Sequence, residues 1–214
     1  EPLCVLKTCK EAGMKLGAFL MPKHPPECSV RAGQLSDLHE LERLDALGFH
    51  EAWIGEHFTA AWEPCPAPDL LIAQALLLTK QIKLGPLGHL LPYHNPVELA
   101  HRVAYLDHMA EGRYQLGVGI GVLPTDHALF ALDASQGRNR KMTFEAIDMM
   151  TRLWTEGASD FQGEFWSMGE TRSELPGLGH HLVPYHGVCQ ESCRLKFKVM
   201  PPFFPQFQLV SFPG

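Results

Sequence analysis

The sequence predicts an α/β fold built on a parallel sheet, and three observations support this prediction. Short apolar segments begin near residues 15, 52, 82 and 114 of the 214-residue chain. A helical pattern follows each of them, so that strand and helix alternate about every thirty residues. Prolines, glycines and capping residues mark the junctions. Two architectures fit this alternation: a (β/α)₈ barrel, which needs about 250 residues, and an open doubly wound sheet.

The first two strand–helix units are bounded by clear local signals. Residues 14–20 form an apolar strand, and after a proline-rich loop leucines recur every three residues from 35 to 47. This period predicts one apolar helix face, with Ser36 as its cap and Gly48 as its stop. A second strand covers residues 52–55, and Pro68-Asp69 opens a second helix that reaches Thr79.

The next two units repeat the pattern. A third strand at residues 82–85 precedes a helix that Asn95-Pro96 begins and Gly112 ends. A fourth strand covers residues 114–119, and a fourth helix is expected over residues 141–154, with Phe144 on its buried side. After Met168 the pattern stops, because residues 169–214 hold 6 of the 17 prolines and match neither helical nor strand periodicity.

Composition restricts the classes of partner. The formal net charge is -6, from 18 Lys+Arg and 24 Asp+Glu, and the basic residues are scattered, so a nucleic-acid partner is not expected. The sequence lacks an apolar run of about 18 residues and a secretory leader, which predicts a cytoplasmic protein without a membrane partner. The six cysteines include no CxxC pair and are predicted to be free thiols.

Candidate site residues follow the carboxyl ends of the predicted strands, where parallel α/β folds place their chemistry. Gly55-Glu56-His57-Phe58 follows the second strand, Pro86-Leu87-Gly88-His89 the third, and Gly119-Ile120-Gly121 the fourth. Imidazole transfers protons near neutral pH, so His57 is a candidate acid or base; a structural role is the alternative.

The glycines and the other histidines give weaker signals. The third glycine of a GxGxxG motif would fall at Val122, so the dinucleotide fingerprint fails. Gly117, Gly119 and Gly121 lack side chains, so they would let a flat cofactor approach the backbone; the alternative is that they form only a tight turn. His94, His101 and His108 are seven residues apart, which is not a zinc spacing, so no metal site is predicted.

Several motifs in order resemble the luciferase-like flavin-dependent monooxygenases. They are GEHF at residues 55–58, LPYHNPV at 91–97, LDHMAEGRYQLGVG at 106–119 and FQGEF at 161–165. The resemblance covers residues 14–168 and implies a TIM-like (β/α)₈ barrel, truncated to its first four to five βα units. Residues 1–13 would then be an irregular extension and residues 169–214 a divergent tail, for which a non-native origin is one interpretation. The first and fourth strands are expected to be open edges, which favours a homo-oligomer.

The resemblance also implies a function. FMN would bind at the strand ends, reduced by a separate flavin reductase, and O2 would then oxidise a small apolar substrate such as a terpene, aldehyde or alkane. His57 matches the family's catalytic histidine, and Leu87-Gly88 a position where the family often has a non-proline cis peptide. The residues implied to bind the cofactor are Glu56, Leu87, Gly88, His89, Gly119 and Gly121.

Departures from the family pattern leave alternatives open. Luciferase has an arginine facing the flavin phosphate where this chain has Ile120, which argues against a light-emitting enzyme. Trp53, Phe58 and Trp62 are expected either to shape an apolar substrate pocket or to pack in the core. A deazaflavin-dependent oxidoreductase of the same barrel family and a non-catalytic flavin-binding fragment are the alternative functions.

Overall fold

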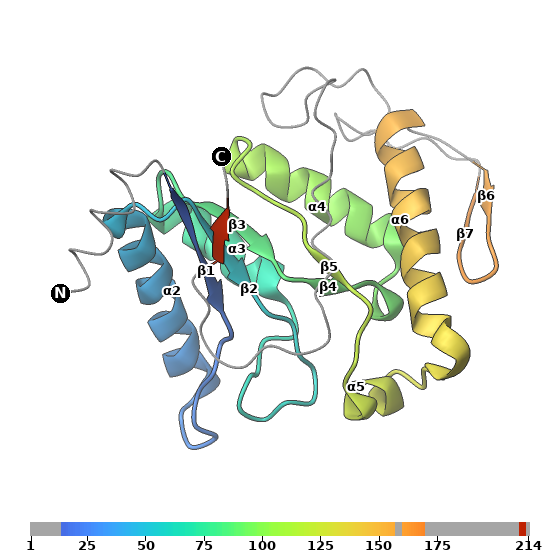
Figure 1. Ribbon diagram of the computed structural model, residues 1–214, viewed down its shortest axis with the longest axis horizontal. Helices are drawn as coiled ribbons and strands as arrows, with labels where there is room; N and C mark the ends of the chain where they lie inside the picture. The colour runs from blue at the N-terminus through green and yellow to red at the C-terminus, as the bar shows by residue number, and fades with distance from the viewer. Residues whose placement is uncertain (1–13, 157–159, 170–209, 213–214) are drawn as a thin grey trace. The chain divides into compact units, whose positions relative to one another are not determined.

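A computed structural model describes residues 14–156 and 160–169, together with the backbone of residues 210–212. The chain divides into two compact units (Figure 1). The first unit consists of residues 1–86 and 203–214, and the second of residues 87–202. Both contain parallel strands followed by helices, so the predicted α/β class is correct for the described residues.

The first unit contains a four-stranded sheet in the order β3-β2-β1-β8. Strands β1 (Lys15–Leu20), β2 (Glu51–Ile54) and β3 (Lys83–Pro86) are parallel neighbours, as predicted. Strand β8 (Val210–Phe212) pairs antiparallel with residues 15–17 of β1. The expectation that the first strand is an open edge is therefore wrong at these residues, because the tail supplies a short edge strand despite its prolines.

Helix α2 (Val30–Leu47) begins earlier than predicted. Ser29, rather than Ser36, is the N-cap, since its Oγ accepts the Ala32 N–H at 3.2 Å. The helix ends as predicted at Gly48, whose φ of 76° is left-handed. The central leucines of the predicted apolar face are buried, whereas Leu35 is 48% exposed. The three-residue period drifts around the helix, so its first leucine leaves the buried side.

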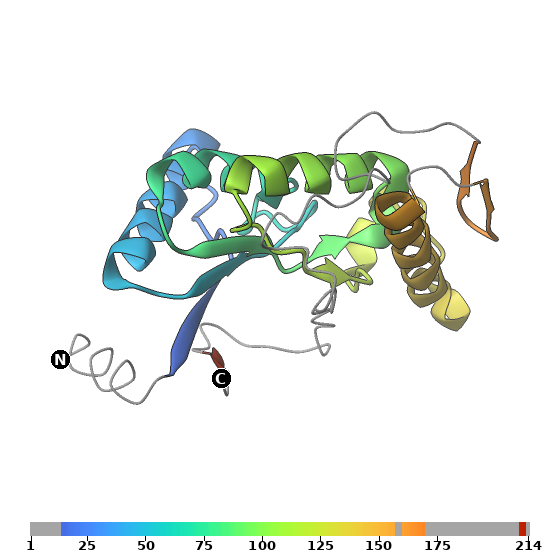
Figure 2. The same ribbon diagram turned by 90° about the horizontal axis from the view of Figure 1, so that it is seen from above.

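Helix α3 (Pro68–Leu78) starts with proline at its first position. Figures 1 and 2 show α2 and α3 on the same face of the sheet. Asp45, near the end of α2, accepts the backbone N–H groups of Lys80, Gln81 and Ile82 at 2.8, 3.0 and 2.7 Å. This carboxylate fixes the turn that leads into β3, because it satisfies three successive donors.

The second unit begins with a short parallel ladder. Strand β4 (His89–Leu90) pairs with β5 (Val118–Gly119), His89 opposite Val118. The predicted fourth strand, residues 114–119, thus forms a ladder only at its end. The partner strand is short because the 3₁₀ helix η1 (Leu91–Tyr93) follows it directly.

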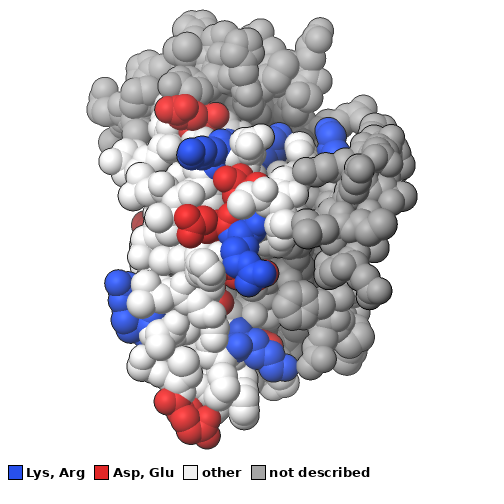
Figure 3. Space-filling view, turned by 90° about the vertical axis from the view of Figure 1, so that its left-hand side faces the viewer, with Lys and Arg blue, Asp and Glu red and all other residues white. Residues whose placement is uncertain are grey.

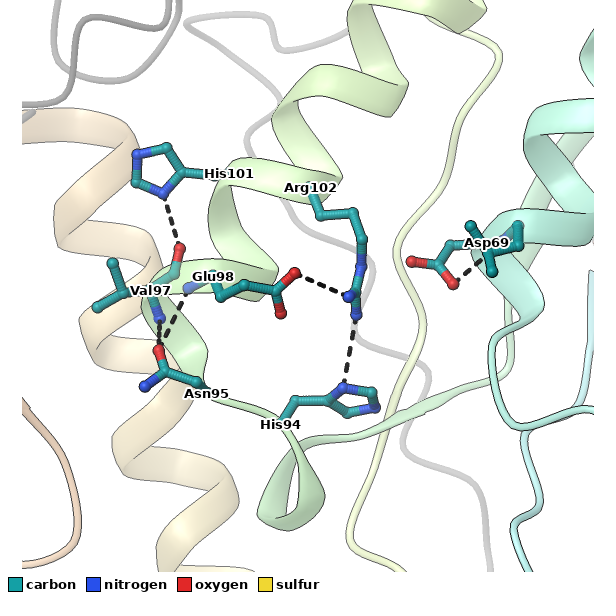
Figure 4. A network of polar contacts seen from close by, with 8 residues as sticks. Asp69, His94, Asn95, Val97, Glu98, His101 and Arg102 are labelled. Carbon is teal, nitrogen blue, oxygen red and sulfur yellow. Dashed lines mark hydrogen bonds and ion pairs between the residues drawn. The ribbon is translucent and has the colours of Figure 1, made fainter.

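Helix α4 (Pro96–Ala110) has the predicted Asn-Pro start. The Asn95 Oδ1 atom accepts the N–H groups of Val97 and Glu98 at 3.0 and 3.2 Å (Figure 4). Helix α6 (Arg138–Glu156) packs against α4, where Trp154 Nε1 donates to the Ala100 carbonyl at 3.1 Å. Phe144 is 59% exposed, so its predicted burial is wrong. The buried face of α6 instead contains Asn139, Thr143, Ala146, Met149, Met150 and Leu153.

The remaining elements of the second unit were not predicted from the sequence. These are α5 (Pro124–Leu129), η2 (Ser135–Gly137) and an antiparallel hairpin of β6 (Phe161–Gln162) and β7 (Ser167–Met168). Glu145 of α6 accepts the backbone N–H groups of Glu164, Phe165 and Trp166 at 2.9, 2.8 and 2.7 Å. This carboxylate attaches the hairpin turn to α6.

The described surface mixes charges of both signs. On the face shown in Figure 3, acidic and basic side chains alternate among uncharged ones. Cys28 and Cys65 are free thiols, while the other four cysteines lie outside the described residues. Among the helices that the structure describes, none has both the length and the apolar character needed to cross a bilayer.

Candidate functional site

His57 follows the carboxyl end of β2, as the sequence predicts. All four residues of β2 are buried, and the Gly55 N–H continues the pairing by donating to Leu20 O at 3.0 Å. A Cβ at Gly55 would lie 2.3 Å from Met21 Sδ, so a glycine suits this close passage. Beyond it the chain leaves the sheet, with Glu56 buried and His57 half-buried.

Two contacts fix His57, one through its backbone and one through its side chain. The His57 N–H donates to Cys65 O at 3.0 Å. Its Nε2 atom lies 3.4 Å from Glu63 Oε2, and the two side chains are 22% and 24% exposed. The other ring nitrogen, Nδ1, is buried and has no hydrogen-bond partner among the described residues. Such an atom is available to a bound ligand.

The loop that carries Glu63 is attached to α2 through His24. The His24 N–H donates to Trp62 O at 2.9 Å, and its Nε2 lies 3.0 Å from both carboxylate oxygens of Asp37. Burial raises the pKa of Asp37, and the hydrogen bond and charge of His24 oppose this shift. A Cβ at Gly33 would lie 2.6 Å from the His24 ring, so α2 needs a glycine to admit the imidazole.

Cys65 is a buried thiol in this loop. Burial, and then the negative charges of Asp37, Glu56 and Asp69, raise its pKa to about 12, and a backbone hydrogen bond at Ala67 opposes this shift. The thiolate is the nucleophilic form of cysteine, so Cys65 is unsuited to nucleophilic chemistry at neutral pH. Its contribution to the site is the backbone carbonyl that binds His57.

In the second unit, the peptide bond between Leu87 and Gly88 is cis, which confirms the expectation from the family resemblance. A Cβ at Gly88 would lie 2.7 Å from backbone atoms of Val118, so glycine permits the two backbones to approach. His89 is fully buried, and its N–H donates to Gly117 O at 2.9 Å. Its ring meets the His94 ring edge to face, with centroids 5.2 Å apart.

The glycines after β5 also make close contacts within the second unit. A Cβ at Gly119 would lie 2.8 Å from Leu90 Cδ2, and one at Gly121 would lie 2.5 Å from Tyr93 Oη. Gly121 has a φ of 67°, which disfavours other residues. The Asn139 Nδ2 atom donates to Gly121 O at 3.0 Å. These contacts support the tight-turn interpretation, and contact of this backbone with a cofactor stays a prediction.

The predicted pocket aromatics and helix histidines have different surroundings. Trp53 is 7% exposed on β2, Phe58 is half-buried and Trp62 is 52% exposed.

The His101 Nδ1 atom lies 2.7 Å from Val97 O, which is a contact within α4 (Figure 4). His101 therefore has a partner within its own helix, and the prediction that the evenly spaced histidines are not metal ligands stays a prediction.

Three residues around His57 were not predicted from the sequence: His24, Asp37 and Glu63. His24 and Asp37 come from a loop and from α2, and only folding brings them to the loop after β2. Glu63 carried a local signal, because an acidic residue shortly after a strand-end histidine is a natural partner for its ring.

Comparison with known proteins assigns the family. The family model described as luciferase-like monooxygenase matches residues 14–207. The chain belongs to the luciferase-like monooxygenase family. The resemblance seen in the sequence motifs is therefore confirmed.

Relatives of this luciferase-like chain include named monooxygenases. It is 40% identical to 4-hydroxyprotoasukamycin monooxygenase of Streptomyces nodosus subsp. asukaensis over 142 residues, which is 66% of this chain and 38% of that protein. It is 40% identical to limonene 1,2-monooxygenase of Rhodococcus erythropolis over 137 residues, 64% of this chain and 35% of that protein. The luciferase-like chain thus spans less than half the length of these relatives.

Solved structures agree with this assignment. The oxygenating constituent of 3,6-diketocamphane monooxygenase from Pseudomonas putida, a type II Baeyer–Villiger monooxygenase in complex with FMN, matches with a TM-score of 0.71 and 32% identity. The match covers 74% of the luciferase-like chain and 44% of that structure. An F420-dependent secondary alcohol dehydrogenase matches with a TM-score of 0.63 at 22% identity, which shows a shared fold alone.

Proposed function

We propose that this chain is the N-terminal part of an FMN-dependent monooxygenase barrel. Reduced flavin from a separate reductase supplies the electrons that split O2, with one oxygen atom entering the organic substrate and the other leaving as water. The buried Nδ1 atom of His57 at a strand end, which has no partner in the part of the chain that the structure describes, carries the proposal together with the family membership. A buried ring nitrogen without a protein partner fits a site in which a ligand supplies that partner.

The candidates for contact with FMN are the residues that the family resemblance implies. They are Glu56, Leu87, Gly88, His89, Gly119 and Gly121. All lie at or just past the carboxyl ends of parallel strands, where α/β proteins bind ligands. Each of these assignments is part of the proposal.

His57 is the proposed catalytic residue. Its ring is fixed at one nitrogen by Glu63, and the other nitrogen is free of partners among the described residues. It can therefore accept or donate a proton at Nδ1 without first breaking a protein hydrogen bond. Cys65, whose pKa is raised to about 12, has no nucleophilic role in this proposal.

The proposed substrate is a small apolar organic molecule of the terpene, aldehyde or alkane class. The names of the relatives support this choice, since they include monooxygenases of limonene, diketocamphanes and alkanals. The deazaflavin-dependent alternative uses the same barrel. A flavin-binding fragment without turnover is the other alternative, because the chain spans less than half the length of its named relatives. Cofactor titration and turnover distinguish the three functions.

The test begins with binding. Purified chain is titrated with FMN, reduced FMN and F420 while cofactor fluorescence is followed, and we expect preferential binding of FMN. Preferential binding of F420 would favour the deazaflavin alternative. Turnover is then measured with NADH, a flavin reductase, FMN and either limonene, a camphane diketone or a long-chain aldehyde, with product detected by mass spectrometry. Flavin binding without product would favour the non-catalytic fragment.

The residue-level prediction concerns His57. His57→Ala should lower turnover by about 10²–10⁴-fold, as expected for loss of a general acid or base, with a much smaller effect on flavin affinity. His39→Ala is the matched control, since His39 is an exposed histidine of the same unit paired with Glu42. Equal turnover in the wild-type and His57→Ala proteins would assign His57 a structural role.

A further inference from the structure

Glu63 makes the ion-pair contact to His57, and it is not among the residues proposed above to contact the flavin. We propose that Glu63 is a positioning residue that holds His57 as the Nε2–H tautomer, so that Nδ1 is the atom that exchanges a proton with the ligand. The chemical use of Nδ1 rests on the proposed function. The tautomer itself can be tested without flavin or substrate.

The two ring nitrogens of His57 have opposite surroundings. Nε2 lies 3.4 Å from a carboxylate oxygen of Glu63, which can only accept a hydrogen bond when ionised. Nδ1 is buried and lacks a partner among the described residues. A neutral imidazole carries one N–H. A proton on Nδ1 would be a buried donor without an acceptor and would leave the Nε2 lone pair facing the carboxylate. A proton on Nε2 avoids both problems.

Glu63 is well placed to impose this choice, because its backbone is bonded on both sides. The Glu63 N–H donates to Ala60 O at 3.0 Å, and Glu63 O accepts the Cys65 N–H at 2.8 Å. Cys65 O in turn accepts the His57 N–H at 3.0 Å. The residues at the two ends of the ion pair are thus joined by short hydrogen bonds within one loop.

Helix α2 fixes the same loop from outside. Trp62, adjacent to Glu63, accepts the His24 N–H through its carbonyl at 2.9 Å, and the His24 ring contacts both oxygens of Asp37. Asp37 is 6% exposed and is one of the buried residues of α2. The carboxylate of Glu63 therefore approaches His57 from a loop held to a regular element, as a positioning group requires.

The first experiment reads the tautomer directly. The chain is labelled with ¹⁵N-histidine, and long-range ¹H–¹⁵N spectra are recorded without cofactor at about pH 8, where an ordinary imidazole is neutral. Loss of one set of signals in His57→Gln assigns His57. We expect the Nε2–H pattern in the wild-type protein and in Glu63→Gln, whose amide oxygen still accepts the bond. Glu63→Leu should give a mixture of tautomers.

Glu42→Leu is the control variant. It removes the exposed carboxylate whose Oε2 atom lies 3.7 Å from His39 Nδ1, and it should leave the His57 signals unchanged. An Nδ1–H pattern in the wild-type protein would overturn the proposal, whether or not the leucine variant folds. Unchanged Nε2–H signals in folded Glu63→Leu would overturn it as well.

The second experiment separates this proposal from the proposed function. In the turnover assay, Glu63→Leu should lower kcat by roughly ten- to a hundredfold with little change in KM, as for other groups that orient a reacting histidine, and Glu63→Gln should recover most of the loss. A wild-type chain with the Nε2–H tautomer but no turnover would contradict the proposed function alone. Normal turnover in Glu63→Leu, with His57→Ala inactive, would contradict the role of Glu63 alone.

Discussion

Replacing Glu145 by alanine should release the hairpin of β6 and β7 from α6. The carboxylate accepts three backbone N–H groups at 2.7–2.9 Å, two of them through Oε1. Hydrogen bonds to charged groups contribute about 1.5–3 kcal/mol each when buried. These are part-buried or exposed, so about 1 kcal/mol for each bond is more appropriate. Their loss should cost about 2–4 kcal/mol in the local opening of the turn.

Hydrogen exchange of the three amides measures this cost. An opening free energy lower by about 2–4 kcal/mol speeds exchange by roughly 30- to 1000-fold. Glu145→Gln keeps an acceptor at Oε1 and loses only the bond to Glu164, so exchange should rise by about tenfold or less. Asp148→Ala on the same helix is the control, because it removes an exposed ion pair with Arg152.

The result has a second, independent check. A Cβ at Gly163 would lie 2.0 Å from Glu145 Oε1, so Gly163→Ala should displace the carboxylate and also speed exchange of the amides at 164–166. Wild-type exchange rates in Glu145→Ala would refute the reasoning, since the turn would then hold without its carboxylate. An equal change in Asp148→Ala would assign the effect to the helix as a whole.

Three further predictions concern the vicinity of the candidate site. Cys65 has a pKa raised to about 12, so it should resist iodoacetamide in the native protein at about pH 8, while the exposed Cys28 reacts. Mass spectrometry measures the labelling of each thiol. Equal labelling of the two would show that Cys65 is accessible and reactive. In the folded protein the pKa of Asp37 is raised above its ordinary value of 3.8, so the folded state binds the carboxyl proton more tightly than the unfolded state does. The contribution of Asp37 to the free energy of unfolding therefore falls as the pH rises through the raised pKa. Asp37→Asn should therefore flatten the decrease in stability above about pH 4 in urea titrations, and an unchanged slope would contradict the shift. Gly121→Ala should destabilise by about 2–4 kcal/mol, because the left-handed φ of 67° and the Tyr93 side chain both oppose a Cβ; an unchanged urea midpoint would contradict this.

Local signals predicted the elements that depend on local chemistry. Gly48 ends α2 in a left-handed conformation, and Asn95-Pro96 begins α4, because capping needs only a few neighbouring residues. The extent of β5 could not be predicted in this way. A ladder needs a partner of equal length, and β4 ends after Leu90.

The candidate site was partly predictable for the same reason. His57 was found because strand ends are recognisable from apolar runs, and the cis peptide at Leu87-Gly88 because the family resemblance extends there. The contacts of His24 with Asp37 and Trp62 join residues 13 and 38 positions apart, and no period or motif in the sequence reports such pairs. Phe144 was misplaced because an apolar side chain fits the helical period without having to face the core.

The contact of His24 with Gly33 and Asp37 has a consequence for how relatives of this protein can diverge. A side chain at position 33 would exclude an imidazole at position 24, since even a Cβ there would lie 2.6 Å from the ring. Loss of that imidazole would leave the buried carboxylate at position 37 without its partner at 3.0 Å. Substitutions at these three positions should therefore occur together during evolution. Because His24 donates to the Trp62 carbonyl, such a concerted change would also shift the loop beside His57.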